Sequence, residues 1–182
     1  MQKLAPSAAA KSGPHFTAVK PCGECNLCCT LLTVNALSKP AGRTCAHLQG
    51  GQCGIHADKP GECSVFQCFW TLATAMDEAW RPDRCGFILW SDHTNRLIVD
   101  VDARRPDAWR REPYYNQLRI WADRDAPHPL EVLVRVRGRM LVVFPETDID
   151  LGAYQPQMSV DSGYLLLAGQ RTPYARFVPA RS

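Results

Sequence analysis

The sequence predicts an α+β protein, in which a small cysteine-rich metal-binding module packs on a small domain made of an antiparallel sheet and helix. The length of 182 residues corresponds to one domain, or to one domain with a small module. Eight of the nine cysteines lie within residues 22–68, a segment rich in Gly and Pro. Short apolar runs bounded by turn residues, with one helical pattern, then fill residues 85–182.

The chain divides into three segments. Residues 1–20 predict a disordered tail, because they are small, polar and aperiodic and lack the apolar core of a secretory signal. Residues 21–84 form the cysteine-rich module, and residues 85–182 form an α+β region continuous with it. No segment reaches the ~20 apolar residues of a membrane span. We therefore expect a cytoplasmic protein without a membrane partner.

Within the module, residues 30–34 predict a short strand or the continuation of a helix that begins near Asn26. Gly50, Gly51 and Gln52 predict a turn. Residues 65–75 predict a helix, because Phe66, Phe69, Trp70 and Ala73 have helical spacing.

The second half predicts strands, hairpins and one helix. The strands are expected at 86–90 and 96–101, at 130–136 and 140–144, and at the last apolar run, 164–168. Arg137-Gly138-Arg139 is a hairpin signal between the second pair. A helix is expected over 113–123, because Pro suits a first helical turn and apolar residues recur at helical spacing behind it.

The cysteines carry the only clear chemistry. They open with C-x-x-C-x-x-C-C, and the eight are Cys22, Cys25, Cys28, Cys29, Cys45, Cys53, Cys63 and Cys68. Thiolates at three-residue steps on a tight loop can converge on one ion. Zinc takes four such ligands, so eight could fill two sites, whereas one cubane cluster would leave four over. Soft thiolates suit both zinc and iron–sulfur centres, so spacing does not separate them.

Disulfides are the alternative for these cysteines, and three observations argue against them. The number of cysteines is odd, no export signal is recognised, and Cys28 and Cys29 are adjacent. Adjacent cysteines pair only through a strained bond, and a reducing cytosol keeps thiols free. We therefore expect a metal or cluster site.

Three further residues lie close to the cysteines. His47 and His56 are alternative ligands or donors to the ligands, with a solvent-facing loop histidine as the more ordinary interpretation. Lys59 could offset thiolate charge, and Pro60 behind it sets the chain direction into Cys63. Cys85 lies apart from the others, and we expect it to pack in the core.

Several ordered segments resemble a known family. They are Cys22-Gly-Glu-Cys25-Asn-Leu-Cys28-Cys29, then Cys45-x-His-Leu, then Gly51-Gln-Cys53-Gly-Ile-His, then Lys59-Pro60-x-x-Cys63-x-x-Phe66. Together they resemble the bacterial CxxCxxCC-type zinc- or iron-chelating domain family (YkgJ-like) over residues 21–70. His56 stands where that family usually has Tyr, and Lys59 where it has Arg. The resemblance implies a metal-binding domain with Zn²⁺ or iron, the iron held as a [4Fe-4S] cluster in one alternative.

No catalytic constellation accompanies the cysteines. Asp100 and Asp102 could act as acid and base, but a solvated strand face is the more ordinary interpretation. Basic and aromatic residues over 104–121 alternate with acids, and the net charge is only +3, which argues against a nucleic-acid partner.

Three function classes follow, in this order. The first is a protein that chelates zinc or iron, with the metal ion as its partner, and it leads because no catalytic constellation is recognised. The second is an iron–sulfur redox or enzyme-accessory protein. The third is a structural zinc module for a protein or RNA partner. The sequence carries no signal for an oligomeric state.

Overall fold

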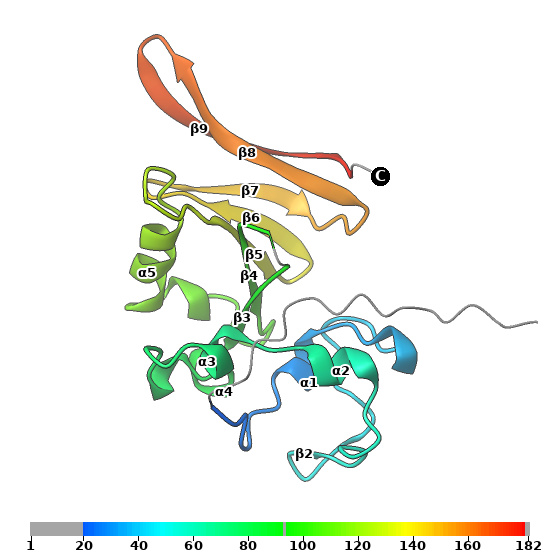
Figure 1. Cartoon of the computed structure of the whole chain (residues 1–182). Coiled ribbons are helices and arrows are strands. Elements are labelled where there is room, and N and C mark those ends of the chain that lie inside the picture. The colour runs from blue at the N-terminus through cyan, green and yellow to red at the C-terminus, as the bar shows by residue number, and fades with distance from the viewer. Residues whose placement is uncertain (1–19, 93, 181–182) are drawn as a thin grey trace, which may run out of the picture.

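A computed structural model describes residues 20–92 and 94–180, and its architecture is α+β, as predicted. Five strands form one sheet in the order β3-β4-β5-β6-β7, and two-stranded hairpins β1–β2 and β8–β9 lie outside it. Figure 1 shows the cysteine-bearing segment beside β3, at one edge of the sheet, and the β8–β9 hairpin beside β7, at the other.

The elements follow one another along the chain with short connections. The first half holds α1 Cys28–Leu31, a 3-10 turn Asn35–Leu37, β1 Leu48–Gln49, β2 Gln52–Cys53, α2 Gly61–Val65, α3 Phe69–Leu72, a 3-10 turn Glu78–Trp80 and α4 Pro82–Cys85. The second half holds β3 Phe87–Ser91, β4 Arg96–Val101, a 3-10 turn Ala108–Arg110, α5 Tyr114–Trp121, β5 Glu131–Val136, β6 Arg139–Val143, β7 Asp148–Ala153, β8 Met158–Leu167 and β9 Gln170–Pro179.

The sheet is mixed, and the predicted all-antiparallel sheet is wrong at one pair. β4 and β5 run parallel, with Arg96 opposite Glu131, while the other neighbouring strands are antiparallel. The segment between β4 and β5 contains α5, because a parallel connection must cross from one end of the sheet to the other.

Most strand and helix predictions of the second half are confirmed to within two residues. β5 and β6 meet at a two-residue turn, where Arg137 and Gly138 have φ of 49° and 72°, the geometry of a type I′ hairpin. β7 and β9 were not predicted, because their polar residues obscure the alternation. The last apolar run proved to be only the end of the ten-residue β8.

In the first half, the turn at Gly50 and Gly51 is confirmed, and both residues have positive φ. The helix predicted over 65–75 is wrong: Phe66 and Cys68 have extended backbones between α2 and α3. Tertiary packing explains the break, because Phe66 and Trp70 reach one cluster while Phe69 reaches another. α1 ends at Leu31, so neither prediction for 30–34 holds over its full length.

The predicted tail, 1–20, lies outside the described residues except for Lys20. The Lys20 N–H donates to the Thr71 carbonyl at 3.1 Å, so this residue belongs to the folded part.

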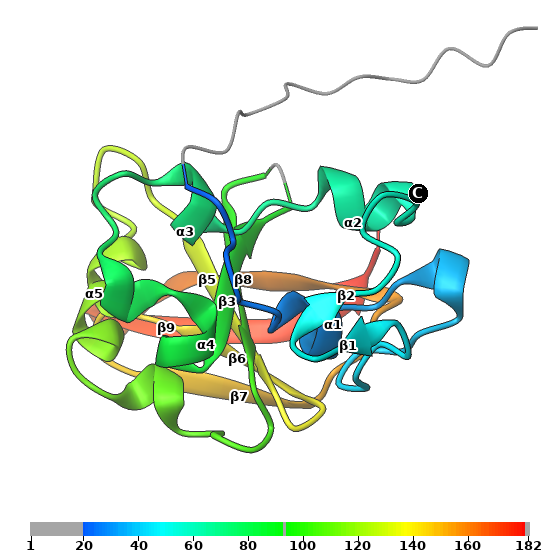
Figure 2. The ribbon, with the colours of Figure 1, turned by 90° about the horizontal axis from the view of Figure 1, so that it is seen from below.

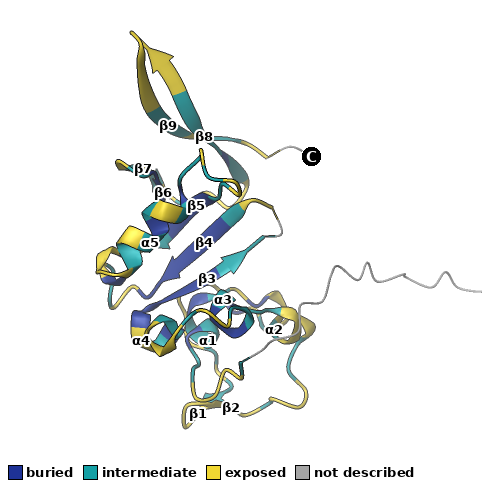
Figure 3. Cartoon of the chain, turned by 60° about the vertical axis from the view of Figure 1, so that its left-hand side comes forward, coloured by how far each residue is buried: buried dark blue, intermediate teal, exposed yellow. Residues whose placement is uncertain are grey.

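Each face of the sheet buries its own apolar cluster, as the dark strands of Figure 3 show. On one face Trp109 and Leu118 pack on residues such as Phe87, Val99 and Val134. Cys85 joins this cluster with 3% exposure, which confirms its predicted place in the core.

The β8–β9 hairpin packs on the opposite face through Val160, Tyr164 and Phe177. Polar contacts fix its position: Arg96 pairs with Glu131 at 2.5 Å and also donates to the Val160 carbonyl at 2.9 Å. Ser162 on β8 donates to the same Glu131 carboxylate. Glu131 therefore holds both β4 and the hairpin.

We expect Glu131→Ala to lower the free energy of unfolding by about 2 kcal/mol, because it leaves the partly buried Arg96 without its counter-charge. Urea denaturation measures this. The control is Arg139→Ala, which breaks an exposed pair with Asp150 and should cost less than about 1 kcal/mol. Equal losses in the two variants would contradict the role of Glu131.

Candidate metal centre

The cysteine-rich opening is a tight turn that leads into one turn of helix. The Cys25 N–H donates to the Cys22 carbonyl at 3.1 Å, and the Cys29 N–H donates to the Asn26 carbonyl at 2.9 Å. Cys28 and Cys29 both lie on α1. Successive residues of a helix differ in direction by about 100°, so these adjacent thiols leave α1 in different directions but stay within reach of each other.

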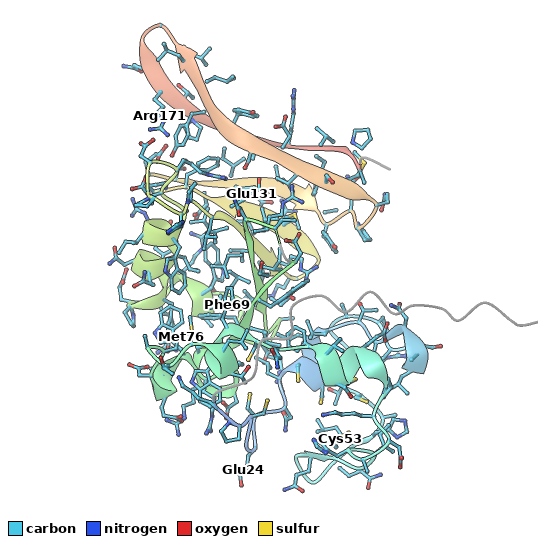
Figure 4. The ribbon with its side chains drawn as sticks, viewed as in Figure 1. Glu24, Cys53, Phe69, Met76, Glu131 and Arg171 are labelled. Carbon is cyan, nitrogen blue, oxygen red and sulfur yellow. The ribbon has the colours of Figure 1, made fainter. Side chains whose placement is uncertain are left out.

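Three more cysteines come from later segments that lie near α1: a loop, the β1–β2 hairpin and α2. The Cys45 N–H donates to the Cys29 carbonyl at 2.9 Å. The β1–β2 hairpin then carries Cys53, which is opposite Leu48 and is labelled in Figure 4. Cys63 lies on α2, and its neighbour Glu62 accepts hydrogen bonds from the side chain of Asn35 and the N–H of Ala36.

Cys68 belongs to the interior of this segment. It is buried in a cluster with Leu27, Leu31, Trp70 and Ile88, against which the side chains of Cys25 and Cys28 also pack. Ile88 comes from β3, so the edge of the main sheet supplies part of the core of the cysteine-bearing segment.

The thiols line two adjoining cavities. The larger, of about 520 Å³, is lined by Cys22, Cys25, Cys28, Cys29, Cys53, Cys63 and Cys68, together with His56 and Lys59. The smaller, of about 120 Å³, is lined by Cys28, Cys29, Cys45, Cys53 and Cys63, together with Lys39 and Lys59. All eight predicted cysteines therefore line a cavity.

All nine cysteines are free thiols, which agrees with the expectation against disulfides. Within residues 20–92 and 94–180, no three His, Cys, Asp or Glu side chains are grouped as the ligands of one metal ion. The thiols surround open volume instead. Their chemistry nevertheless fits the expected metals, because thiolates are the preferred ligands of zinc and of iron–sulfur clusters.

The adjacent thiols Cys28 and Cys29 shift each other's pKa in opposite directions. The Cys28 S–H donates to the Cys29 sulfur, which lowers the pKa of Cys29 to about 6 and raises that of Cys28. Lys39 lowers the pKa of Cys29 further through its charge. Cys29 is therefore the most acidic thiol among those with resolved shifts.

Lys39 is a functional candidate that the sequence did not single out. It is only 6% exposed, and its ammonium donates to the carbonyls of Thr30, Leu32 and Pro40. Burial lowers the pKa of Lys39, while the nearby thiols Cys45, Cys29, Cys28 and Cys63 oppose that shift. No motif marks a lysine ten residues after Cys29, the nearest earlier cysteine, so spacing could not reveal it.

Asp83 on α4 holds Cys25 from the other side. The Cys25 S–H donates to the Asp83 carboxylate, and the backbone of Asp83 also hydrogen-bonds to the sulfur. Burial is nevertheless the largest effect and raises the pKa of Cys25 to about 11. Arg81 binds Asp83 at 2.7 Å and keeps its carboxylate ionised.

The remaining predicted residues differ in their positions. His56 is exposed at the larger cavity, with its Nε2 3.4 Å from the Lys59 ammonium. Lys59 lines both cavities. Burial raises the pKa of the Cys22 thiol, and the charge of Lys59 opposes that shift. His47 lines neither cavity. The extended backbone of Pro60 begins α2, as expected for the residue that directs the chain to Cys63.

Asp100 and Asp102 do not form the solvated strand face that the sequence favoured. They are 8% and 3% exposed. Asp100 binds Arg135 at 2.5 Å and accepts from the indole of Trp90 at 2.8 Å, while Asp102 pairs with Arg104 at 2.8 Å. Each carboxylate forms an ion pair with an arginine, so Asp100 and Asp102 have a structural role.

Comparisons with family models, with curated proteins and with solved structures found no match to this chain. In the described part of the chain, no helix has the length and apolar character needed to cross a membrane.

In the metal-free reduced protein at pH 7, we expect iodoacetamide to alkylate Cys29 roughly tenfold or more faster than Cys25, because only the thiolate is nucleophilic. Peptide mass spectrometry after timed quenching measures the rates. Cys28→Ala removes the hydrogen bond to Cys29 and should slow its alkylation. Equal rates at Cys25 and Cys29 would contradict the pKa directions.

We expect Lys39→Gln to weaken zinc binding by about ten- to a hundredfold, or about 1.4–2.8 kcal/mol. Gln keeps N–H donors for the carbonyls but loses the charge beside the thiolates. Competition with a chromophoric chelator measures the affinity. Lys39→Arg, which keeps the charge, is the matched control and should bind more tightly than Lys39→Gln. Equal affinity of the Gln variant and the wild type would reduce Lys39 to a structural role.

Proposed function

We propose that this protein chelates zinc or iron through its clustered cysteines. The observation that carries the proposal is the gathering of seven thiols around one cavity of about 520 Å³. Cysteines spread over 47 residues of sequence come to this cavity from a turn, two short helices, a hairpin and the extended segment before α3. Core packing alone would not require so many thiols around open volume, because buried free cysteine ordinarily packs as a small apolar residue.

The size of the larger cavity favours an iron–sulfur cluster over a single ion there. Four sulfurs bound to one zinc lie only about 2.3 Å from it, which leaves no cavity. A volume of about 520 Å³ falls within the ~300–1,000 Å³ of cofactor and small-molecule sites. Cys22, Cys25, Cys28 and Cys68 are the thiols we assign to such a cluster, which would supply one-electron redox chemistry.

The sequence motifs of residues 21–70 support the same class of function. Their order and spacing resemble the CxxCxxCC-type chelating domains, and the two departures, at His56 and Lys59, fall on residues other than the cysteines. Metal binding through cysteines requires reduced thiols, and a cytoplasmic location, where thiols stay reduced, belongs to this proposal.

A redox or enzyme-accessory role is the second candidate, because one side of the larger cavity reaches solvent. Cys22 is the one exposed cysteine, and it lines this cavity together with the exposed His56 and the half-buried Lys59. A centre held there would be accessible to an electron donor or to a small ligand.

We expect protein purified without oxygen to be brown and to contain iron with acid-labile sulfide, with a broad absorption band near ~400 nm from cysteine-ligated clusters. Metal analysis and a visible spectrum on one sample test this. If the protein is colourless and contains only zinc, the proposed metal chelation is supported and the proposed iron–sulfur cluster is overturned. Protein without metal and with oxidised thiols would overturn the proposed function.

A further inference from the structure

The two cavities divide the eight cysteines unevenly. Cys22, Cys25 and Cys68 line only the larger cavity, and Cys45 lines only the smaller. The other four, Cys28, Cys29, Cys53 and Cys63, line both. Cavity lining therefore assigns four of the eight thiols to one cavity. The four that line both cavities are assigned by their other contacts.

Packing places Cys28 with the larger cavity. Its side chain packs, with that of Cys25, against the buried cluster that contains Cys68. Among the described residues, neither Cys29 nor Cys53 belongs to this cluster. Cys25, Cys28 and Cys68 thus share one apolar surface, which continues onto β3 through Ile88.

Backbone contacts place Cys29 with the smaller cavity. The Cys29 carbonyl accepts from the Cys45 N–H at 2.9 Å, so the two residues are held together. The Cys45 carbonyl in turn accepts from the Leu48 N–H at 3.1 Å, and Leu48 pairs with Cys53 across the β1–β2 hairpin. This chain of contacts joins Cys29, Cys45 and Cys53.

Cys63 completes the group from α2. It lines the smaller cavity together with Cys29, Cys45 and Cys53. Glu62 fixes this end of α2 by binding the turn at Asn35, and that turn leads directly to Lys39.

We propose that Cys29, Cys45, Cys53 and Cys63 form a second metal site that holds a single divalent ion of the zinc type. This site is separate from the centre assigned to Cys22, Cys25, Cys28 and Cys68, and the inference rests on the proposed function. The volume of the smaller cavity, about 120 Å³, suits an ion drawn in by four thiolates better than a cluster with its own sulfides.

Charge supports the assignment. Four thiolates around a divalent cation leave two net negative charges, which are costly in a partly buried site unless a cation lies near. The buried Lys39 lines the same cavity as Cys29, Cys45 and Cys63. This lysine lines the smaller cavity and not the larger.

The first experiment is thiol footprinting of the metal-free full-length protein. One equivalent of Zn²⁺ is added without oxygen, free thiols are labelled with N-ethylmaleimide, and labelled positions are read by peptide sequencing in the mass spectrometer. We expect Cys29, Cys45, Cys53 and Cys63 to be protected together, while Cys22 and Cys25 react; Cys68 is buried with or without metal and is not used as a reporter. Protection of a mixed set, or of the Cys22 group instead, would overturn the assignment.

The second experiment uses paired variants and Co²⁺, whose visible spectrum reports tetrahedral thiolate ligation. Cys45→Ser/Cys53→Ser should weaken binding of the first equivalent at least about tenfold, while Cys22→Ser/Cys25→Ser should leave it unchanged. Cys85→Ala removes a thiol outside both groups and is the control. Equal loss in both paired variants would overturn two separate sites.

The outcomes separate this inference from the proposed function. If the wild-type protein takes up neither Zn²⁺ nor iron, both are overturned. If Zn²⁺ protects the expected four thiols but no iron–sulfur cluster forms, the second site is supported and the cluster is overturned. If a cluster forms but Zn²⁺ protects a mixed set, only the second site is overturned.

Discussion

The candidate site depends on the burial of Ile88 beneath the cysteine-bearing segment. Alternate residues of a strand face opposite sides, so Phe87 and Leu89 enter the main core while Ile88 meets Leu27, Leu31 and Trp70. Trp90 extends this contact by packing edge-on against Phe66 with ring centroids 6.2 Å apart. Because its own helices are only four or five residues long, the segment could not bury enough apolar area alone.

One turn of helix explains how a single short motif can serve two cavities. Cys28 and Cys29 are neighbours in sequence, yet one packs toward Cys68 and the other is bound through its backbone to Cys45. The adjacency that argues against an ordinary disulfide is then what brings two groups of thiols within contact of each other. The side-chain amide of Asn26, just before α1, donates to the Gly51 carbonyl in the β1–β2 turn at 3.1 Å. Figure 2 shows α1 and this hairpin from below.

The rest of the molecule acts as a support. The five-stranded sheet holds β3 in place, and the buried pairs Asp100–Arg135 and Arg96–Glu131 tie its strands and the β8–β9 hairpin together. Tyr154 and Trp90 flank the Arg135 guanidinium, each with its ring centroid 5.3 Å away. Trp90 thus contacts both the Asp100–Arg135 pair of the sheet and the apolar cluster around Ile88 beneath the cysteine-bearing segment.

The sequence by itself determined the class of fold, the positions of β3 to β6 and α5, and the thiols that form the candidate site, because periodicity, turn residues and cysteine spacing are local signals. Only the tertiary structure decided which thiols lie together. Lys39 and Asp83 reach the cysteines through loops whose path depends on packing, and α3 is separated from α2 because Phe66 and Phe69 pack in different clusters. Such contacts join residues far apart in the chain, and no local pattern records them.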